Sequence, residues 1–119
     1  MQRTYILLSA LVWVGAVVAQ TNKGGISGTV FDQQGAVVPA ATVTITNLGT
    51  NESIRLTSSE SGAYSAPLLD PVYYRVTVEA AGFKKAVIEK IKVDTAMVAS
   101  ANVTLEPGAV ATEITVSAS

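Results

Sequence analysis

The chain has 119 residues, of which 49% are hydrophobic and 14% charged, and its formal net charge is −1. This balance excludes a disordered chain and offers no basic patch that would attract nucleic acid. Cysteine and histidine are both absent, which excludes disulfides, Cys/His zinc sites and a Ser-His-Asp triad.

The first residues have the layout of a cleaved secretory signal. Arg3 supplies a short positive region, and an uncharged, mostly apolar stretch runs from Ile6 to Ala19. Small or compact residues occupy the −3 and −1 positions before Gln20, as signal cleavage requires. The alternative is a retained membrane anchor, but this stretch of about 14 residues is shorter than the roughly 20 that span a bilayer. We therefore expect cleavage between Ala19 and Gln20 and an exported mature chain.

From Gly25 onward the hydrophobic pattern has the two-residue period of β-strands, and no segment of helical length has a 3.6-residue period. Alternation of apolar and polar residues predicts strands at residues 26–30, 42–46, 53–57, 64–66, 73–80, 83–88, 91–93 and 99–105. Seven or eight short strands separated by turns are typical of an antiparallel immunoglobulin-like or transthyretin-like sandwich. We therefore predict an all-β fold in one domain.

Glycines and prolines mark the turns of this sandwich, because glycine suits tight turns and proline restricts the backbone. The predicted turn residues are Gly35, Pro39, Gly62, Pro71 and Gly82. Between the turns, one face of each strand is apolar, and this face should form the core. The predicted core residues are Val43, Ile45, Tyr64, Val76 and Val78.

The acidic residues are scattered through turns and outward strand positions, and no two have the spacing of an acid/base pair. Asp32, Glu60 and Asp70 could gather at one end of the sandwich as calcium ligands, but no DxDxDG-like loop is present. The glycine-rich stretch Gly24–Gly28 leads into a strand, whereas a phosphate loop leads into a helix. We expect no catalytic residue, no cofactor, no metal site and no enzymatic activity.

One pair of side chains is a candidate binding surface. Tyr73 alternates with Tyr74, which we assign to the core, so Tyr73 should point outward beside Arg75. An exposed tyrosine next to an arginine can stack on a sugar or a peptide. The alternative is that Tyr73 packs across neighbouring strands.

After Gly108, the end of the chain contains one more strand-like run, Glu113–Val116. We interpret residues 108–119 as a connector or the start of a following domain; the alternative is a frayed tail. Residues 1–19 are then the signal peptide, 20–23 a short linker and 24–107 the sandwich. The last strand should leave an edge open to strand addition, which an inward charge or proline at Val103 or Ile114 would weaken.

Two groups of motifs resemble the carboxypeptidase regulatory-like domain. Gly25–Ile45 is similar to its opening pattern G-x-V-x-D-x-x-G-x-x-[IV]-x-x-A-x-V. Further similar motifs follow at Ser61–Tyr64, Leu68–Pro71, Tyr74–Val78 and Ala81–Phe83, so the resemblance covers roughly residues 24–107. The family usually has Pro-Gly where this chain has Pro71-Val72. Because valine avoids positive φ, the local turn should differ.

This resemblance implies a transthyretin-like or carbohydrate-binding-like β-sandwich that serves as an accessory module, without the zinc site of the peptidases. Signal, domain and tail together also resemble the N-terminal extension of bacterial TonB-dependent outer-membrane receptors. That implies a periplasmic or outer-membrane-associated domain whose partners are envelope proteins or receptor domains. The alternative is a free-standing secreted module that binds a glycan or a protein.

Overall fold

The computed structural model describes residues 22–108 and 113–116. These residues form nine strands and no helix: β1 (Gly24–Asp32), β2 (Thr42–Asn47), β3 (Ser53–Thr57), β4 (Ala63–Leu69), β5 (Tyr73–Glu79), β6 (Lys85–Lys92), β7 (Val98–Ser100), β8 (Val103–Leu105) and β9 (Glu113–Thr115). Within the described residues no helix could span a membrane. The predicted cleavage site between Ala19 and Gln20 lies outside them.

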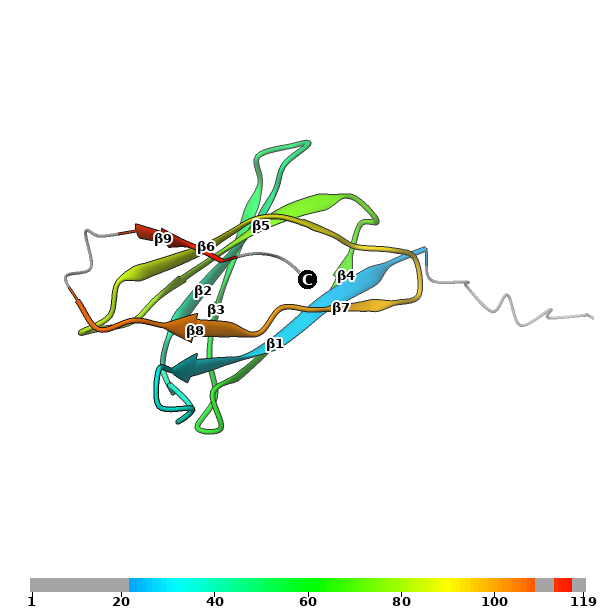
Figure 1. Ribbon diagram of the computed structural model, residues 1–119. Helices are drawn as coiled ribbons and strands as arrows, with labels where there is room; N and C mark the ends of the chain where they lie inside the picture. Colours follow the sequence, from blue (N-terminus) through cyan, green and yellow to red (C-terminus); the bar gives the residue numbers. More distant parts are fainter. Residues whose placement is uncertain (1–21, 109–112, 117–119) are drawn as a thin grey trace, which may run out of the picture.

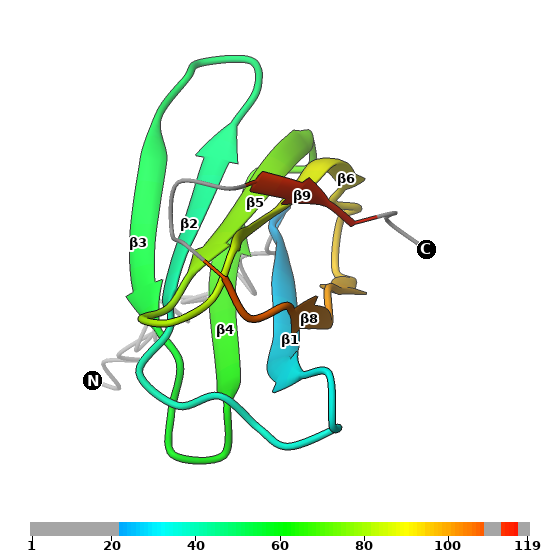
Figure 2. The ribbon, with the colours of Figure 1, turned by 60° about the vertical axis from the view of Figure 1, so that its left-hand side comes forward.

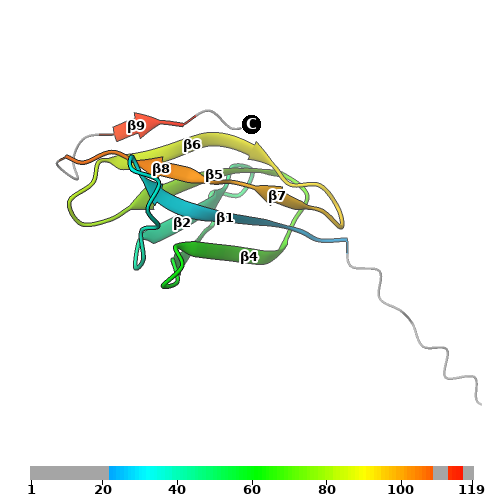
Figure 3. The same ribbon diagram turned by 60° about the horizontal axis from the view of Figure 1, so that its bottom comes forward.

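The strands form two sheets that face each other, which confirms the predicted β-sandwich (Figure 1). One sheet has the order β4-β1-β7, with β8 also paired to β1, and the other has the order β3-β2-β5-β6-β9. Most pairs are antiparallel, but β7 and β8 run parallel to β1, and β9 runs parallel to β6. Figure 3 shows β9 lying alongside β6 at the side of the sandwich.

The core lies between the sheets and is built by the predicted alternation. On β2 and β5, apolar side chains point inward while threonines point away, as expected for sheets with one face in water. The five predicted core residues are all buried: Val43, Ile45, Tyr64, Val76 and Val78. Gly28 on β1 is required by a close approach, because a Cβ atom there would lie 2.0 Å from the carbonyl oxygen of Ala101.

Two strand predictions need correction. Residues 83–88 and 91–93 do not form separate strands, because β6 runs unbroken from Lys85 to Lys92. Between its pairings to Tyr74 and Val76, β6 contains an extra residue, a β-bulge that disturbs the alternation without ending the strand. Conversely, residues 99–105 form two short strands, β7 and β8. The ladder breaks between them, where the side-chain oxygen of Asn102 accepts a hydrogen bond from the Thr29 amide, 2.9 Å away.

The predicted turn residues occupy turns or strand ends. Gly35, Gly62 and Gly82 have φ of 81°, 74° and 83°, a region that glycine adopts without steric cost. Pro39 precedes Ala40, whose φ is 58°. Pro71 lies between β4 and β5.

The turn at Pro71-Val72 has no positive φ at either residue. The amide of Val72 donates to the carbonyl of Asp70, 2.8 Å away, and the positive φ occurs earlier, at Leu68, where it is 59°. The chain thus reverses differently from a Pro-Gly turn, as expected from the valine.

The strand-like run near the end of the chain belongs to this sandwich. In β9, Glu113, Ile114 and Thr115 pair with Lys85, Ala86 and Val87 of β6. Ile114 and Val116 are partly buried against the core. Residues 113–116 therefore pack on the sandwich, whereas 109–112 and 117–119 lie outside the described residues, and the interpretation of 108–119 as a connector stays a prediction.

Candidate binding surface

Tyr73 and Arg75 lie on the same outward face of β5, two residues apart. Tyr73 is 43% exposed, whereas Tyr74 is 4% exposed and belongs to the core. The Tyr74 hydroxyl donates to the carbonyl of Asp70, 3.0 Å away. Strand alternation therefore places the two tyrosines on the two faces of the sheet as expected.

Both candidate residues have partners on β6. The Lys90 ammonium lies 4.2 Å from the centroid of the Tyr73 ring, a cation–π contact. The Nε atom of Arg75 lies 3.4 Å from Oε2 of Glu89, and both side chains are about half exposed. Because Lys90 covers one face of the ring, a sugar or peptide that stacks on that face must displace it. Glu89 and Lys90 lie at the bulge in β6, so the bulge supplies both partners.

A shallow polar hollow of about 370 Å³ extends from Arg75 across the outer face of the five-stranded sheet. Its lining comes from β2, β5 and β6: Thr46, Arg75, Thr77, Lys85, Val87 and Glu89. Lys85 lies 3.9 Å from the Glu79 carboxylate, and Arg75 pairs with Glu89. Positive and negative groups alternate here, so the hollow favours neutral polar ligands over a strongly charged one.

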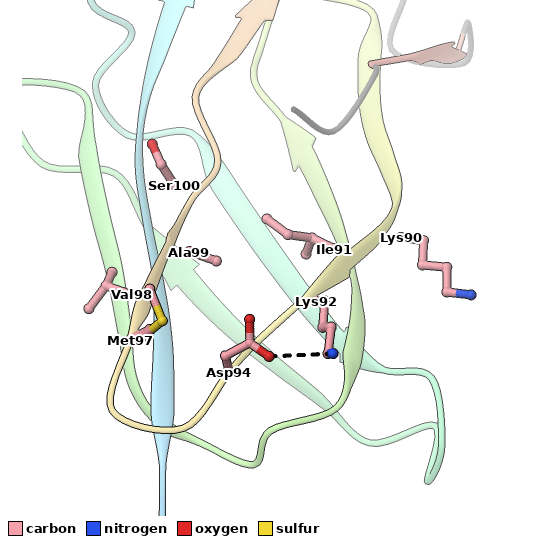
Figure 4. A pocket seen from close by; sticks show the side chains of 8 residues that line it. All are labelled: Lys90, Ile91, Lys92, Asp94, Met97, Val98, Ala99 and Ser100. Carbon is pink, nitrogen blue, oxygen red and sulfur yellow. Dashed lines mark ion pairs between the residues drawn. The ribbon is translucent and has the colours of Figure 1, made fainter.

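A second hollow, of about 390 Å³, lies where the β6 end faces β7 (Figure 4). Lys92 and Asp94 form an ion pair of 3.5 Å on one side, and Met97 and Val98 lie on the other, 63% and 66% exposed. Figure 4 shows the Lys90 side chain extending away from the hollow. The residues that line this second hollow are Lys90, Ile91, Lys92, Asp94, Met97, Val98, Ala99 and Ser100.

A third hollow, of about 400 Å³, lies at the opposite side of the sandwich, between the free edges of β3 and β4. Ile54 and Leu68 are its exposed apolar residues, at 43% and 70%. Sequence reasoning missed it, because Ile54 alternates like a core residue but lies on the edge strand β3 and stays exposed. The adjacent pair Leu68-Leu69 was the available signal, since it breaks the alternation and only Leu69 is buried.

The described residues contain no group of three or more acidic, histidine or cysteine side chains that could hold a metal ion. The three carboxylates considered as calcium ligands, Asp32, Glu60 and Asp70, do not form a group of this kind. Asp32 accepts hydrogen bonds from the amides of Gln34 and Ala36, Asp70 pairs with Lys23, and Glu60 lies in an exposed turn.

The titratable groups with shifted pKa values are core tyrosines. Burial raises the pKa of Tyr64 to about 12, and burial, followed by the Asp70 charge, raises the pKa of Tyr74. Neither tyrosine lies on the outer face with Tyr73 and Arg75. Their pKa values therefore reflect packing, and a neutral tyrosine at physiological pH is a poor proton acceptor.

Comparison with known families confirms the resemblance seen in the motifs. Residues 25–106 match the family described as the carboxypeptidase regulatory-like domain. No match to this chain is found among curated proteins.

Solved structures with similar folds include the Bacillus anthracis TIE protein, with a TM-score of 0.63 and 22% identity over 72% of this chain. A proposed carbohydrate-binding protein from Bacteroides uniformis has a TM-score of 0.58 and 18% identity over 70% of this chain. A catechol 1,2-dioxygenase from Acinetobacter radioresistens has a TM-score of 0.58 and 13% identity over 82%. The similar region covers 17%, 41% and 56% of those chains, respectively, and it shows a shared fold alone.

Proposed function

Because the chain belongs to the carboxypeptidase regulatory-like domain family, we propose that it is an exported, non-catalytic accessory module, and more specifically the N-terminal periplasmic extension of a TonB-dependent outer-membrane receptor. The observation that carries this proposal is the order of segments. A stretch with the features of a secretory signal ends at Ala19, and the family domain begins at residue 25. Export as a leading domain accounts for this order.

The non-catalytic part of the proposal is supported by chemistry. The full sequence has no histidine and no cysteine, so it lacks the commonest general base and thiol nucleophile. The described carboxylates with partners serve as turn caps or ion pairs, as at Asp32 and Glu89. Such a module acts by contact, through its edges and its outer face.

Export is tested by fractionation and intact mass of the protein in its native host. We expect a mature N-terminus at Gln20 and the same N-terminal peptides in a larger species in the outer membrane. Ala19→Leu at the −1 position should block cleavage, whereas Ala16→Leu at −4 should leave cleavage unchanged. An uncleaved cytoplasmic product beginning at Met1 would overturn the proposal.

A second candidate is a free-standing secreted module that binds a glycan or a protein, and the exposed Tyr73 beside Arg75 favours it. In the fractionation experiment, a soluble species from Gln20 to Ser119 would support this candidate over the receptor extension. A glycan array then tests the outer face: Tyr73→Ala should abolish any binding seen with the unchanged chain. Binding that survives this substitution would exclude Tyr73 as the contact.

A further inference from the structure

An open sandwich has free strand edges that can pair with other chains, and most edges of this one are blunted. Strand β4 contains Pro67 and Leu68, whose φ is positive, and both residues interrupt regular pairing. β7 and β8 have three residues each and are broken between them. The β6 end not covered by β9 has Lys90 and Lys92, and charged edge residues discourage pairing.

The edge strand β3 has fewer of these protections: it has no break and no positive φ, and its single charged residue is Arg55. Its five residues, SIRLT, pair with β2 in an unbroken register and include no proline, glycine or lysine. β3 is the last strand of its sheet, and Figure 2 shows no strand beyond it. At the other edge of the same sheet, β9 has only three residues. Among the described edges, β3 is therefore the longest without a break, a proline or a positive φ, and so the one best suited to accept another strand.

The hydrogen bonds that flank β3 show which backbone groups face outward. The amide of Asn47 donates to the carbonyl of Glu52, 2.8 Å away, and the amide of Ser58 donates to the carbonyl of Ala41, 2.9 Å away. Residues of an antiparallel strand alternate between facing the neighbour and facing away. Ser53, Arg55 and Thr57 therefore direct their amide and carbonyl groups to the free edge.

The side chains of β3 add a chemical preference to this free edge. Arg55 is exposed, and among the described residues it is the cationic side chain with neither an ion pair nor an aromatic contact. Ile54, on the opposite face of β3, is exposed beside Leu68 in the hollow between β3 and β4. An added strand would place one residue opposite Arg55 on the outer face and its neighbours toward Ile54.

We propose that β3 is the docking edge for an extended segment of a partner protein that carries an acidic residue between two apolar residues. The acidic side chain pairs with Arg55, the apolar residues cover Ile54 and Leu56, and the main chain bonds to Ser53, Arg55 and Thr57. This proposal deepens the proposed function, since it rests on the chain being a binding module, and it names the partner's chemistry.

A second copy of this chain fits the edge less well. Two β3 strands paired antiparallel with full overlap would place Arg55 opposite its own copy, and like charges directly opposite each other are destabilising. The free cation thus disfavours self-association and favours an acidic partner.

The test uses the purified chain and the peptide acetyl-Thr-Val-Glu-Val-Thr-amide, followed by NMR amide exchange. We expect slower exchange at Ser53, Arg55 and Thr57 and little change at Ile54 and Leu56, whose amides face β2. The same peptide with lysine in place of glutamate should bind about fivefold more weakly, as the size of cross-strand charge effects implies.

Two matched controls separate strand addition from simple charge attraction. A methyl group on the glutamate nitrogen of the peptide should abolish binding, whereas one on a valine nitrogen, which faces away from β3, should be tolerated. Arg55→Glu should reverse the preference to the lysine peptide, whereas Lys84→Glu, which changes the net charge equally, should not.

Three results would overturn the proposal: equal binding of both peptides, protection at β7 or β6 instead of β3, or a dimer through β3 in sedimentation without peptide. Because the purified chain is used, each of these results is independent of where the protein is exported. Failure of this proposal and failure of the receptor assignment are therefore distinguishable.

Discussion

Tyr64 shows how one side chain ties together strands that are distant in sequence. It lies on β4, is 5% exposed, and its hydroxyl donates to the carbonyl of Ala101, in the break between β7 and β8. The bond passes β1 at Gly28, where an added Cβ would lie 2.8 Å from the Tyr64 hydroxyl. Gly28 therefore leaves the space in which the Tyr64 hydroxyl meets the Ala101 carbonyl.

The ionisation of Tyr64 should make the protein sensitive to alkaline pH. Its pKa is about 12 in the folded chain and about 10 when unfolded, because burial disfavours the charged phenolate. The unfolded state therefore loses its proton first, and the free energy of unfolding should be intact below pH 10 and fall by roughly 2–3 kcal/mol between pH 10 and 12.

Urea unfolding at pH 8 and at steps up to pH 12 measures this fall. Tyr64→Phe should cost about 1–2 kcal/mol at pH 8 through the lost hydrogen bond, and it should reduce the alkaline fall; the part due to Tyr74 would remain. A variant with the same alkaline fall as the unchanged chain would show that Tyr64 is not the group responsible.

For single residues, the alternation of apolar and polar positions predicted the direction of side chains but not their partners. That Tyr73 points outward and Tyr74 inward follows from the period of a strand. That Lys90 lies over the Tyr73 ring and Glu89 near Arg75 depends on which strand neighbours β5 and on the bulge in β6. Pairing between strands is non-local, so residue spacing does not reveal it.

At the scale of elements, the breaks in the strands were the hardest features to predict. The bulge in β6 makes the sequence pattern predict two strands, 83–88 and 91–93, because it interrupts the two-residue period. The break between β7 and β8 was invisible because Ala101 and Val103 both continue the apolar alternation and both are buried. At this break, the Ala101 amide donates to the carbonyl of Ser27 and the Asn102 side chain accepts a hydrogen bond from the Thr29 amide, both on β1.

The edge strand β9 yields a prediction at this scale. Ile114→Asp should detach β9 from β6 while the rest of the sandwich stays folded, because Ile114 is only partly buried and β9 contacts β6 alone among the paired strands. We expect a loss of about 1–2 kcal/mol in the free energy of unfolding. The measurement is denaturant unfolding together with amide exchange at Val116, whose amide bonds to the carbonyl of Val87.

Thr115→Asp is the matched control, since Thr115 is exposed and should tolerate a charge. Val103 is unsuitable for the same purpose, because it is 1% exposed and a charge there would disrupt the core. Val103 and Ile114 lie in different sheets, on β8 and β9, and strand addition at the end of the chain stays a prediction. If Ile114→Asp unfolded the whole domain, β9 would be essential to the sandwich.

For the whole molecule, stability should depend on one apolar core without crosslinks or metal. The sequence has no cysteine or histidine, and the described residues contain no metal-binding group. We expect the thermal midpoint to be unchanged by EDTA or by a reducing agent. A fall of about 4–8 °C with EDTA would correspond to roughly 1 kcal/mol of metal-dependent stability and would contradict this expectation.

The whole fold by itself says little about activity. Similar sandwiches occur in a catechol dioxygenase and in a proposed carbohydrate-binding protein, so function depends on the side chains placed on the fold. In this chain the most distinctive placements are the unprotected edge of β3 with Arg55 and the outer face with Tyr73.

Residue types and their period alone predicted four features: the fold class, the core residues, the family motifs and the outward direction of Tyr73 and Arg75. These features are local, because each strand's two faces follow from its own sequence. The tertiary structure decided the parallel pairing of β7, β8 and β9, the partners of Tyr73 and Arg75, and the free edge of β3. These features depend on which strands become neighbours. Contacts between segments that are distant in sequence produce no characteristic residue spacing, so a single sequence does not reveal them.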